Sequence, residues 1–574
     1  MKNQEIARIF YEIADILEMQ GVNWKPVAYR KAARALESLS EDIEEIYKKG
    51  KLEDIPGVGE GLAKKIKQYI ETGRIEEYER LKKTLPKGIT KLMEIQGLGP
   101  KKVKTLYKKL GIKSIKDLER AAKQHKISKL PLFKEKTEEN ILKGLELYKR
   151  GEERTFLHFI IPVAENIVNQ LKSLKEVDKA IAAGSLRRRK ETVRDIDILV
   201  ISKNPAKVMD FFTTMPSVRR VLAKGPTKSA VIIREGIQVD VRVVEPRSFG
   251  SALMYFTGSK DHNIALRAIA IKKGYKLSEY GLFLKKNDRM IAGKTEEEVY
   301  KKLGMAYVEP ELRENMGEID AALHKKLPKL VKESDIKGDL HIHSKYSDGS
   351  NSVLDIANYC KKLGYKYISI SDHSKSQKIA HGVEEKDLMK KVEEVKKVKR
   401  QVPGIKVFCG AEVDIKVDGS LDYDDDVLKK MDLVTASVHS NFKLPRDKMT
   451  DRLIAALENP YVNILGHPTG RLIAHREAYD FDFDKILEVA KKNKKFLEIN
   501  CVPDRMDLPP NLIKAAVDNG VKLAIGTDAH NLDQLSFIHE GVSLARRGWC
   551  EKKDVLNTYD LPQLVKLLGV RNAF

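Results

Sequence analysis

The order of hydrophobic and polar positions divides the chain into regions of different character. In the first twenty residues apolar side chains recur every three or four positions, as at Ile6, Ile9, Phe10 and Ile13, with acids on the opposite face. This spacing predicts an amphipathic helix and argues against a signal peptide. Helical patterning, interrupted by glycine and proline, continues to about residue 150.

Apolar runs typical of strands follow from about residue 155 to about 245. They read KAIAAGS, DIDILVIS, SAVIIRE and IQVDVRVVE. A mixed segment extends to about 310, and the polar, proline-interrupted stretch after it is interpreted as a linker.

The rest of the chain alternates seven short apolar runs with helical stretches. The runs read DLHIH, YISIS, VFCGAE, LVTASVH, VNILGH, FLEIN and KLAIGTDAH. This alternation predicts a parallel α/β sheet or barrel. We therefore expect a multidomain protein with α+β and α/β parts.

Composition narrows the class of protein. At 574 residues the chain is too long for one hydrophobic core, and it contains no run of about 18 apolar residues that would predict a membrane span. The cysteines are widely spaced and form no C-x-x-C pair, which indicates a reduced, cytoplasmic protein without disulfides. They are Cys360, Cys409, Cys501 and Cys550.

The positive charge is concentrated in one part of the chain. The formal net charge is +23, of which residues 335–574, with 38 basic and 36 acidic side chains, carry +2. Residues 1–334, with 68 basic and 47 acidic side chains, carry +21. A polyanionic partner for this first part is the natural inference, although lysine enrichment is also common in thermophiles.

Two glycine motifs share one pattern. IPGVGEGLAKKI (55–66) and IQGLGPKKVKTL (95–106) each place a hydrophobic residue before G-x-G and a basic amphipathic helix after it. Glycine allows the backbone N–H groups to approach a phosphate, and the helix N-terminus adds partial positive charge. A helix-capping turn is the alternative for either copy alone, but together they resemble helix–hairpin–helix motifs, which hold the DNA backbone. The glycines are Gly57, Gly59, Gly97 and Gly99.

GSLRRRKETVRDIDILV (184–200) places two carboxylates behind a cluster of arginines. Asp195 and Asp197 point to one face of a predicted strand because side chains alternate with period two. Surface salt bridges are the ordinary interpretation of such a pair. A divalent metal that meets a polyphosphate is the alternative.

The motifs AYRKAARAL, IPGVGEGLAKKI, GSLRRRKETVRDIDILV, VDVRVVE and YFTGSKDHNIALR occur in the order and spacing of the family X DNA polymerases. Residues 1–315 resemble this polymerase beta-like family. The resemblance implies a nucleotidyltransferase palm in which Asp195, Asp197 and Asp240 are catalytic and hold Mg²⁺ (or Mn²⁺) between a primer 3′-hydroxyl and a deoxynucleoside triphosphate. Such oxygen ligands suit Mg²⁺, and phosphoryl transfer depends on the neutralised charge.

The same resemblance implies a nucleotide-binding set. For Tyr255 and Phe256 core packing is the simpler interpretation from sequence alone. Arg189 and Gln238 depart from the family pattern, which affects the expected fidelity and primer geometry and leaves metal binding unchanged. The implied set is Gly184, Ser185, Arg188, Tyr255, Phe256, Gly258, Asn263 and Arg267.

The first domain also resembles the family's lyase domain. By this resemblance Lys65 is the lysine that forms a Schiff base with an abasic sugar, while Lys25 and Tyr29 bind its 5′-phosphate. A nucleophilic lysine needs a lowered pKa, to which neighbouring lysines contribute. Gly61 replaces one phosphate-binding lysine, and a lysine in a lysine-rich helix is usually a solvated charge. Both interpretations of Lys65 stay open.

Histidines and carboxylates recur at the ends of the apolar runs in the last part of the chain. One histidine at a strand end is usually structural, but a repeated set is how an α/β barrel assembles a metal site. The set resembles that of the PHP (polymerase and histidinol phosphatase) domain, a distorted (β/α)7 barrel, over residues 335–574. The candidate ligands are His341, His343, Asp348, His373, Glu412, His439, His467, Asp528 and His530.

The PHP resemblance implies three ions. His341, His343, Glu412 and Asp528 would hold one, Glu412, His439 and His467 a second, and Asp348, His373 and His530 a third. Mixed nitrogen and oxygen ligands suit Zn²⁺ or Mn²⁺, and such a cluster can activate water against a phosphoester. Arg471 is either a contact to substrate phosphate or a surface arginine.

The combination is similar to the bacterial and archaeal PolX family. It implies a template-directed polymerase that fills short gaps in DNA repair, a metal-dependent 3′→5′ exonuclease in the PHP domain, and a 5′-deoxyribose-phosphate lyase or abasic-site activity. A repair nuclease with minor polymerisation and a DNA-end-binding scaffold are the alternatives. The expected partners are gapped or primer–template DNA and deoxynucleoside triphosphates, with no membrane, and the expected state is a monomer.

The predicted domains follow from these assignments. They are a helical lyase-like domain with a helix–hairpin–helix (1–85), a second helix–hairpin–helix subdomain (86–150), a nucleotidyltransferase palm (151–245), a nucleotide- and nascent-base-pair-binding subdomain (246–318), a linker (319–336) and a PHP metallophosphoesterase domain (337–574).

Overall fold

The computed structural model describes most of the chain. It covers residues 2–570 apart from 23, 39–42, 56, 85–88, 90–91, 93–97, 131–132, 134–137, 139–140, 143–144, 146–153 and 474. The chain divides into two compact units: residues 1–155, 171–181 and 194–304 form the first, and residues 156–170, 182–193 and 305–574 form the second.

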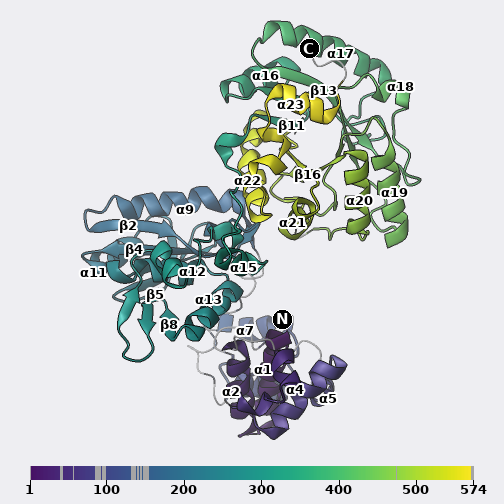
Figure 1. Cartoon of the computed structure of the whole chain (residues 1–574). Helices are drawn as coiled ribbons and strands as arrows, with labels where there is room; N and C mark the ends of the chain where they lie inside the picture. The colour runs from purple at the N-terminus through teal and green to yellow at the C-terminus, as the bar shows by residue number, and fades with distance from the viewer. Residues whose placement is uncertain are drawn as a thin grey trace. The chain divides into compact units, whose positions relative to one another are not determined.

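The N-terminal region is helical, as its periodicity predicts (Figure 1). Ile6, Phe10 and Ile13 are fully buried in a core that the first helices share. Leu98, Val103 and other residues up to Leu145 form a second core. The elements are α1 (Lys2–Gln20), α2 (Lys25–Ser38), α3 (Ile43–Lys48), η1 (Leu52–Asp54), α4 (Glu60–Thr72), α5 (Glu76–Lys83), α6 (Pro100–Leu110) and α7 (Ile115–Lys123).

A mixed five-stranded sheet follows in the order β2-β4-β7-β6-β5. β4 and β7 are parallel neighbours, whereas β6 pairs antiparallel with both β7 and β5. Four of these strands, β2, β4, β6 and β7, coincide with the predicted apolar runs, whereas β5 was not predicted. A two-stranded sheet joins β1 to β3. The elements are β1 (Thr155–Phe156), α9 (Leu157–Lys172), β2 (Val177–Ala182), α10 (Gly184–Arg187), β3 (Thr192–Val193), β4 (Asp195–Ser202), α11 (Pro205–Thr213), β5 (Val218–Lys224), β6 (Lys228–Ile233) and β7 (Gln238–Val243).

Helices and a small antiparallel sheet, ordered β10-β9-β8, occupy the next segment. The predicted linker contains a short helix, α15, and a turn of 3-10 helix. The elements are η3 (Pro246–Ser248), α12 (Phe249–Thr257), α13 (Lys260–Lys272), β8 (Tyr275–Ser278), β9 (Gly281–Leu284), β10 (Met290–Ala292), α14 (Glu296–Lys302), η4 (Pro310–Leu312), α15 (Glu318–Leu323) and η5 (Glu333–Asp335).

Seven parallel strands, paired in sequence order from β11 to β17, build the C-terminal part. The predicted α/β barrel is therefore confirmed. A parallel bridge between Ile342 and Ala529 nearly closes it, together with hydrogen bonds from His343 N to Ala529 O (2.9 Å) and from Asp528 N to His341 O (2.9 Å). The strands are β11 (Gly338–Ile342), β12 (Tyr367–Ile370), β13 (Lys406–Asp414), β14 (Leu433–Ser437), β15 (Ile464–Leu465), β16 (Phe496–Asn500) and β17 (Leu523–Gly526).

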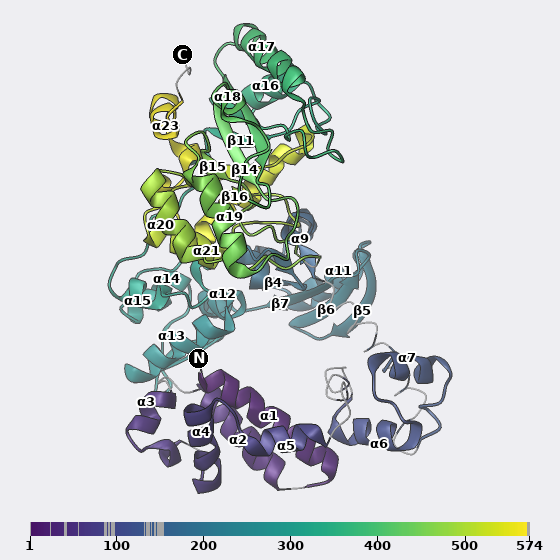
Figure 2. The same ribbon diagram turned by 90° about the vertical axis from the view of Figure 1, so that its right-hand side faces the viewer.

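Helices surround these strands (Figures 1 and 2), and α19 and α20 lie side by side. They are α16 (Val353–Lys362), α17 (Glu385–Gln401), α18 (Asp425–Leu428), α19 (Arg446–Glu458), α20 (Phe483–Asn493), α21 (Pro510–Asp518), η6 (Leu532–Phe537), α22 (Ile538–Arg547), η7 (Lys552–Asp554), η8 (Leu556–Thr558) and α23 (Leu561–Leu568). Among the described residues, no helix has both the length and the hydropathy that a membrane crossing requires.

Candidate active sites

Three carboxylates meet on two neighbouring parallel strands. Asp195 and Asp197 lie on one face of β4, and Asp240 of β7 stands opposite Asp197 in the register. Burial, reinforced by repulsion from Asp195 and Asp240, raises the pKa of Asp197 to about 7. Burial and Asp240 also raise the pKa of Asp195. Oxygen donors that repel one another in this way fit divalent cations, which would relieve the repulsion.

Two polar side chains contact Asp240, one of the three carboxylates. Gln238, which faces Asp195 across the sheet, donates from Nε2 to Asp240 Oδ2 (2.6 Å). The ammonium of Lys228 is 3.7 Å from Asp240 Oδ1. Gln238, which departs from the family pattern, thus places its amide in hydrogen-bond contact with a candidate metal ligand, Asp240.

Part of the predicted nucleotide set lies around α12 and α13. Tyr255 and Phe256 are near the end of α12 with their rings 5.1 Å apart, and Gly258 ends this helix. Asn263 donates from Nδ2 to the carbonyl oxygen of Tyr255 (2.7 Å). Tyr255 is 38% exposed and Phe256 is half-buried, so core packing does not account for the position of Tyr255. Arg267 is exposed, one helical turn beyond Asn263.

The predicted triphosphate-binding residues belong to the other compact unit. Gly184, with φ of 64°, begins α10, and Ser185 follows in the same short helix. Arg188 donates from Nε to Glu314 Oε1 (2.8 Å), so its guanidinium is already paired with a carboxylate.

The second glycine of each hairpin has the same backbone conformation. Gly59 caps the N-terminus of α4 with φ −90° and ψ 175°, and Gly99 caps α6 with φ −88° and ψ 171°. Gly57 has φ of 88°, and a Cβ there would lie 2.8 Å from Cγ of Lys31, so glycine is required. Gly97 lies outside the described residues.

Lys65 and Tyr29 meet at a carboxylate that the sequence analysis missed, Glu77 of α5. The Lys65 ammonium is 3.0 Å from Glu77 Oε2, and the Tyr29 hydroxyl donates to the same oxygen (3.0 Å). Burial alone would raise the pKa of Glu77, but Lys65 and Tyr29, with a smaller effect of Lys25, lower it. Lys25 itself is exposed at the start of α2.

The nine candidate ligands of the barrel converge at the C-terminal ends of its strands. In the first group, His341 Nε2 is 3.2 Å from His343 Nε2 and 3.5 Å from Glu412 Oε2, and His343 Nε2 is 3.0 Å from Asp528 Oδ1. Four ligands of a tetrahedral ion at about 2.1 Å would be roughly 3.4 Å apart. The donor atoms of this group lie 3.0–3.9 Å apart, which fits such an ion.

Glu412 also joins a second group. Its Oε1 is 2.8 Å from His467 Nε2 and 3.3 Å from His439 Nε2, and its Oε2 is 2.9 Å from His373 Nδ1. Burial would raise the pKa of Glu412, but the histidines around it lower that pKa well below its usual range.

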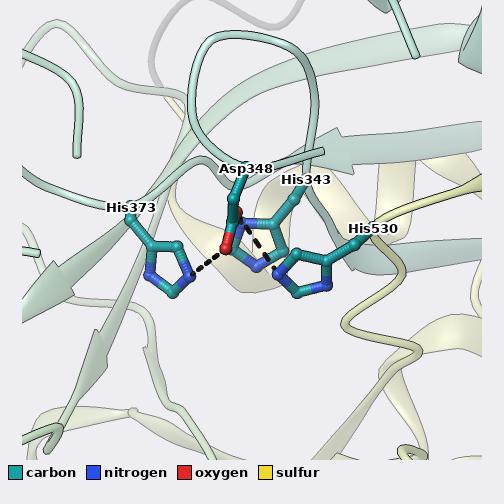
Figure 3. A group of neighbouring side chains, drawn as sticks. All are labelled: His343, Asp348, His373 and His530. Atoms are coloured by element: carbon teal, nitrogen blue, oxygen red, sulfur yellow. Dashed lines mark ion pairs between the residues drawn. The ribbon is translucent and has the colours of Figure 1, made fainter. Parts of the chain in front are cut away.

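The third group surrounds Asp348, which Figure 3 shows between His373 and His530. His530 Nε2 is 3.3 Å from Asp348 Oδ1, and His373 Nε2 is 3.8 Å from Oδ2. His343 contributes a second nitrogen to this group, because its Nδ1 is 3.8 Å from Asp348 Oδ1. The ring of His343 stacks on that of His530 at 4.3 Å.

Two further observations indicate that these groups are built to hold ions. Six of the candidate ligands, among the described residues, each have one buried polar atom without a hydrogen-bond partner: His343, Asp348, His373, Glu412, His467 and Asp528. His467 and Asp528 also have φ of 26° and 53°, a conformation that is costly for residues other than glycine. Such orphaned atoms and strain are typical of functional sites.

Two carboxylates behind the ligands were not predicted. Glu498 of β16 is 2% exposed, its Oε1 is 2.6 Å from His341 Nδ1, and its Oε2 accepts from His467 N (2.6 Å). Asp414 Oδ1 lies 2.6 Å from His439 Nδ1. Carboxylates on the second ring nitrogen orient metal-binding histidines.

Arg471 lies on the loop that follows His467. It donates from Nε to the carbonyl oxygen of Arg505 (2.9 Å) and from Nη2 to that of Met506. Its Nη2 is also 3.6 Å from Glu191, so the guanidinium is fixed in place and is not a free surface charge.

Four family models match the chain. A helix-hairpin-helix domain matches residues 1–75, a SAM-like helix-hairpin-helix tandem 89–146, the DNA polymerase beta thumb 252–314 and the PHP domain 339–502. The DNA polymerase/3′-5′ exonuclease PolX of Bacillus subtilis (strain 168) is 38% identical over 571 residues, 99% of each chain. The chain belongs to the PolX family. The expected family is therefore confirmed, as is the expected fold class.

Other relatives match only part of this PolX-family chain. A probable phosphatase of Thermoanaerobacter sp. (strain X514) is 32% identical over 232 residues, 38% of this chain and 89% of its own. DNA polymerase lambda of Rattus norvegicus is 25% identical over 342 residues, 54% of this chain and 56% of its own.

Proposed function

We propose that this PolX-family chain fills short gaps in DNA as a template-directed polymerase and trims 3′ ends with its barrel. The observation that carries the polymerase assignment is the register of β4 and β7, which sets Asp197 directly opposite Asp240. Mg²⁺ or Mn²⁺, when bound, supplies the charge neutralisation that phosphoryl transfer needs. Asp195, Asp197 and Asp240 would hold it, while Gly184, Ser185 and Arg188 bind the triphosphate.

The barrel is the proposed exonuclease. Its three ligand groups would hold Zn²⁺ or Mn²⁺, and the bound ions supply Lewis acidity and activated water. The residues themselves fix the ligand geometry: Glu412 contributes one oxygen to each of two groups, and Glu498 and Asp414 orient His341 and His439. Arg471 would bind a phosphate of the 3′-terminal nucleotide.

The proposed partners are gapped or primer–template DNA and deoxynucleoside triphosphates. The two hairpins present glycine-capped helix N-termini with Lys101 and Lys102 in the first turn of α6. The +21 charge of residues 1–334 supports backbone binding, and we propose a cytoplasmic monomer.

A lyase activity is a second candidate function, favoured by the Lys65–Glu77–Tyr29 group. The Lys65 ammonium and the Tyr29 hydroxyl each lie 3.0 Å from the Glu77 carboxylate. This group could bind an abasic 5′-end, and the carboxylate could accept the proton that the lysine releases. Lys65 would be the nucleophile.

Primer extension by Asp240→Ala tests the palm assignment. The full chain is given one-nucleotide-gapped DNA with Mg²⁺ or Mn²⁺, with and without deoxynucleoside triphosphates. Extension should fall by about 10²- to 10³-fold, since removal of one group that stabilises charge in the transition state commonly costs that much, while DNA binding stays nearly unchanged. Asp210→Ala, which removes an exposed carboxylate of α11, is the matched control. Undiminished extension by Asp240→Ala would favour the nuclease or scaffold alternatives.

A further inference from the structure

One carboxylate in residues 182–193, the segment that contains the proposed triphosphate-binding residues, contacts the barrel. Glu191 is the single acidic residue of segment 182–193, where it follows four consecutive basic residues. This segment and the barrel belong to the same compact unit. Among the described residues, the ion pairs of Glu191 are with Arg547 and Arg471, which lie far from it in the sequence.

These contacts are largely shielded from water. Glu191 Oε2 is 2.6 Å from Arg547 Nη1 of α22, and its Oε1 is 3.6 Å from Arg471 Nη2. The Glu191 side chain is 15% exposed and that of Arg547 5%. Burial alone would raise the pKa of Glu191, but the two arginines outweigh it and lower the pKa to about 2, so the carboxylate is charged at neutral pH.

Arg471 connects Glu191 to the loops of the metal site. Gly470 N donates to His467 O (2.9 Å), which closes the turn that leads from this ligand to Arg471. Arg471 in turn holds the backbone of Arg505 and Met506, and Arg505 Nε is 4.0 Å from Asp528 Oδ2. The loops after β15 and β16 are thereby joined through one guanidinium.

We propose that Glu191 is a positioning residue for the exonuclease, because it holds the guanidinium of Arg471 in the orientation that receives a substrate phosphate. Glu191 and the two backbone carbonyls engage Nε and Nη2. Nη1 has no hydrogen-bond partner among the described residues, and the side chain is 18% exposed. This inference rests on the proposed role of Arg471 as a phosphate ligand. It gives a residue of the polymerase sequence a function in the nuclease.

The same helix offers a matched control. Arg546 Nε of α22 is 2.8 Å from Glu311 Oε1, in a contact of comparable burial that does not involve Arg471. Glu191→Gln and Glu311→Gln each remove one carboxylate charge that pairs with an arginine of α22. Only the first removes a contact to Arg471.

The test uses steady-state degradation of a 5′-labelled single-stranded oligonucleotide by the full chain with Mn²⁺ and without nucleotides. Arg471→Ala should raise KM by about tenfold or more, the effect expected for loss of a charge-assisted phosphate contact. Glu191→Gln should raise KM about fivefold, the size expected for loss of the single 3.6 Å ion pair to Arg471 while its two backbone contacts stay, and leave kcat within about twofold. Glu311→Gln should change neither. In the Arg471→Ala background, Glu191→Gln should have no further effect on KM.

The outcomes separate the two claims. An unchanged KM for Arg471→Ala would refute its role as a phosphate ligand and remove the basis of the inference. A raised KM for Arg471→Ala with an unchanged KM for Glu191→Gln would overturn the inference alone. The inference would also be overturned if Glu191→Gln and Glu311→Gln raised KM equally, or if Glu191→Gln raised KM fully in the Arg471→Ala background. In either case Glu191 would act through general stability.

Discussion

Replacing Glu498 by glutamine should weaken metal binding in the barrel without changing any ligand. The two carboxylate oxygens of Glu498 face two different donors, the Nδ1 of His341 and the backbone N–H of His467. His341 uses its Nε2 toward the first ligand group, so its Nδ1 must carry the proton. Glutamine has the same shape but only one acceptor oxygen. Its NH2 group must therefore oppose one of these two donors.

The expected loss follows from the hydrogen bond that is broken. A hydrogen bond to a charged group contributes about 1.5–3 kcal/mol, and each ~1.4 kcal/mol is a factor of ten in affinity. Both contacts are 2.6 Å long and buried, so solvent screening does not reduce this value. We expect the tightest Zn²⁺ or Mn²⁺ affinity to fall by about 10- to 100-fold, as for other residues that orient metal-binding histidines.

The assay is a competition titration. Metal-stripped full chain is titrated with Zn²⁺ and separately with Mn²⁺ against a fluorescent chelator, and thermal unfolding checks that the variant is folded. Asp414→Asn is the matched control, because it removes the carboxylate on His439 and should weaken a different group of ligands. Wild-type affinity at every site in folded Glu498→Gln would refute the reasoning.

Two further changes test other parts of the structure. The pKa of Glu191, lowered to about 2, means that its stabilisation is complete above the pKa of an unfolded glutamate and is lost as the pH falls toward 2. A pKa shift from 4.5 to about 2 corresponds to about 3 kcal/mol, so Glu191→Gln should lose about this free energy of unfolding at pH 7. Its free energy of unfolding, measured by urea denaturation, should also change less between pH 5 and 2 than that of the unmodified chain. Parallel pH profiles of the two proteins would contradict this assignment. Borohydride should trap the full chain on a 5′-deoxyribose-phosphate end, and Lys65→Ala should abolish the adduct, whereas Lys64→Ala, whose ammonium pairs with Glu60 on the surface, should retain it. Equal trapping by Lys65→Ala and the unmodified chain would show that another amine is the nucleophile.

The strands could be read from the sequence because their patterns are local. DIDILVIS became β4, and the seven apolar runs became β11 to β17, since burial on both faces of a parallel strand demands continuous apolar residues. The alternation of Asp195 and Asp197 likewise required only the period of a strand. The facing position of Asp240 could be expected only from the family, because register across a long connection is not encoded locally.

Glu498 was not predicted, because the pattern that indicates the metal site consists of histidines and acids at strand ends. It lies inside FLEIN, between two buried apolar residues, and a single acid within such a run is a detectable signal of a buried partner. Glu77 gave no such signal, since it is one of several acids at the start of α5. The pairing of Glu191 with Arg471 joins residues 280 positions apart and could not follow from any periodicity.

The central claim is that one chain carries two separate metal-dependent sites, one that adds nucleotides and one that removes them. The most direct measurement follows both reactions on one labelled gapped DNA, with Mn²⁺ and deoxynucleoside triphosphates, for the full chain and for the double variant His341→Ala, His343→Ala. The double variant should lose 3′→5′ degradation, because two ligands at the C-terminal end of β11 are gone, and should accumulate extended product that is no longer trimmed. If it still degrades DNA at the original rate and with the same metal dependence, the exonuclease lies outside the barrel and the account is wrong.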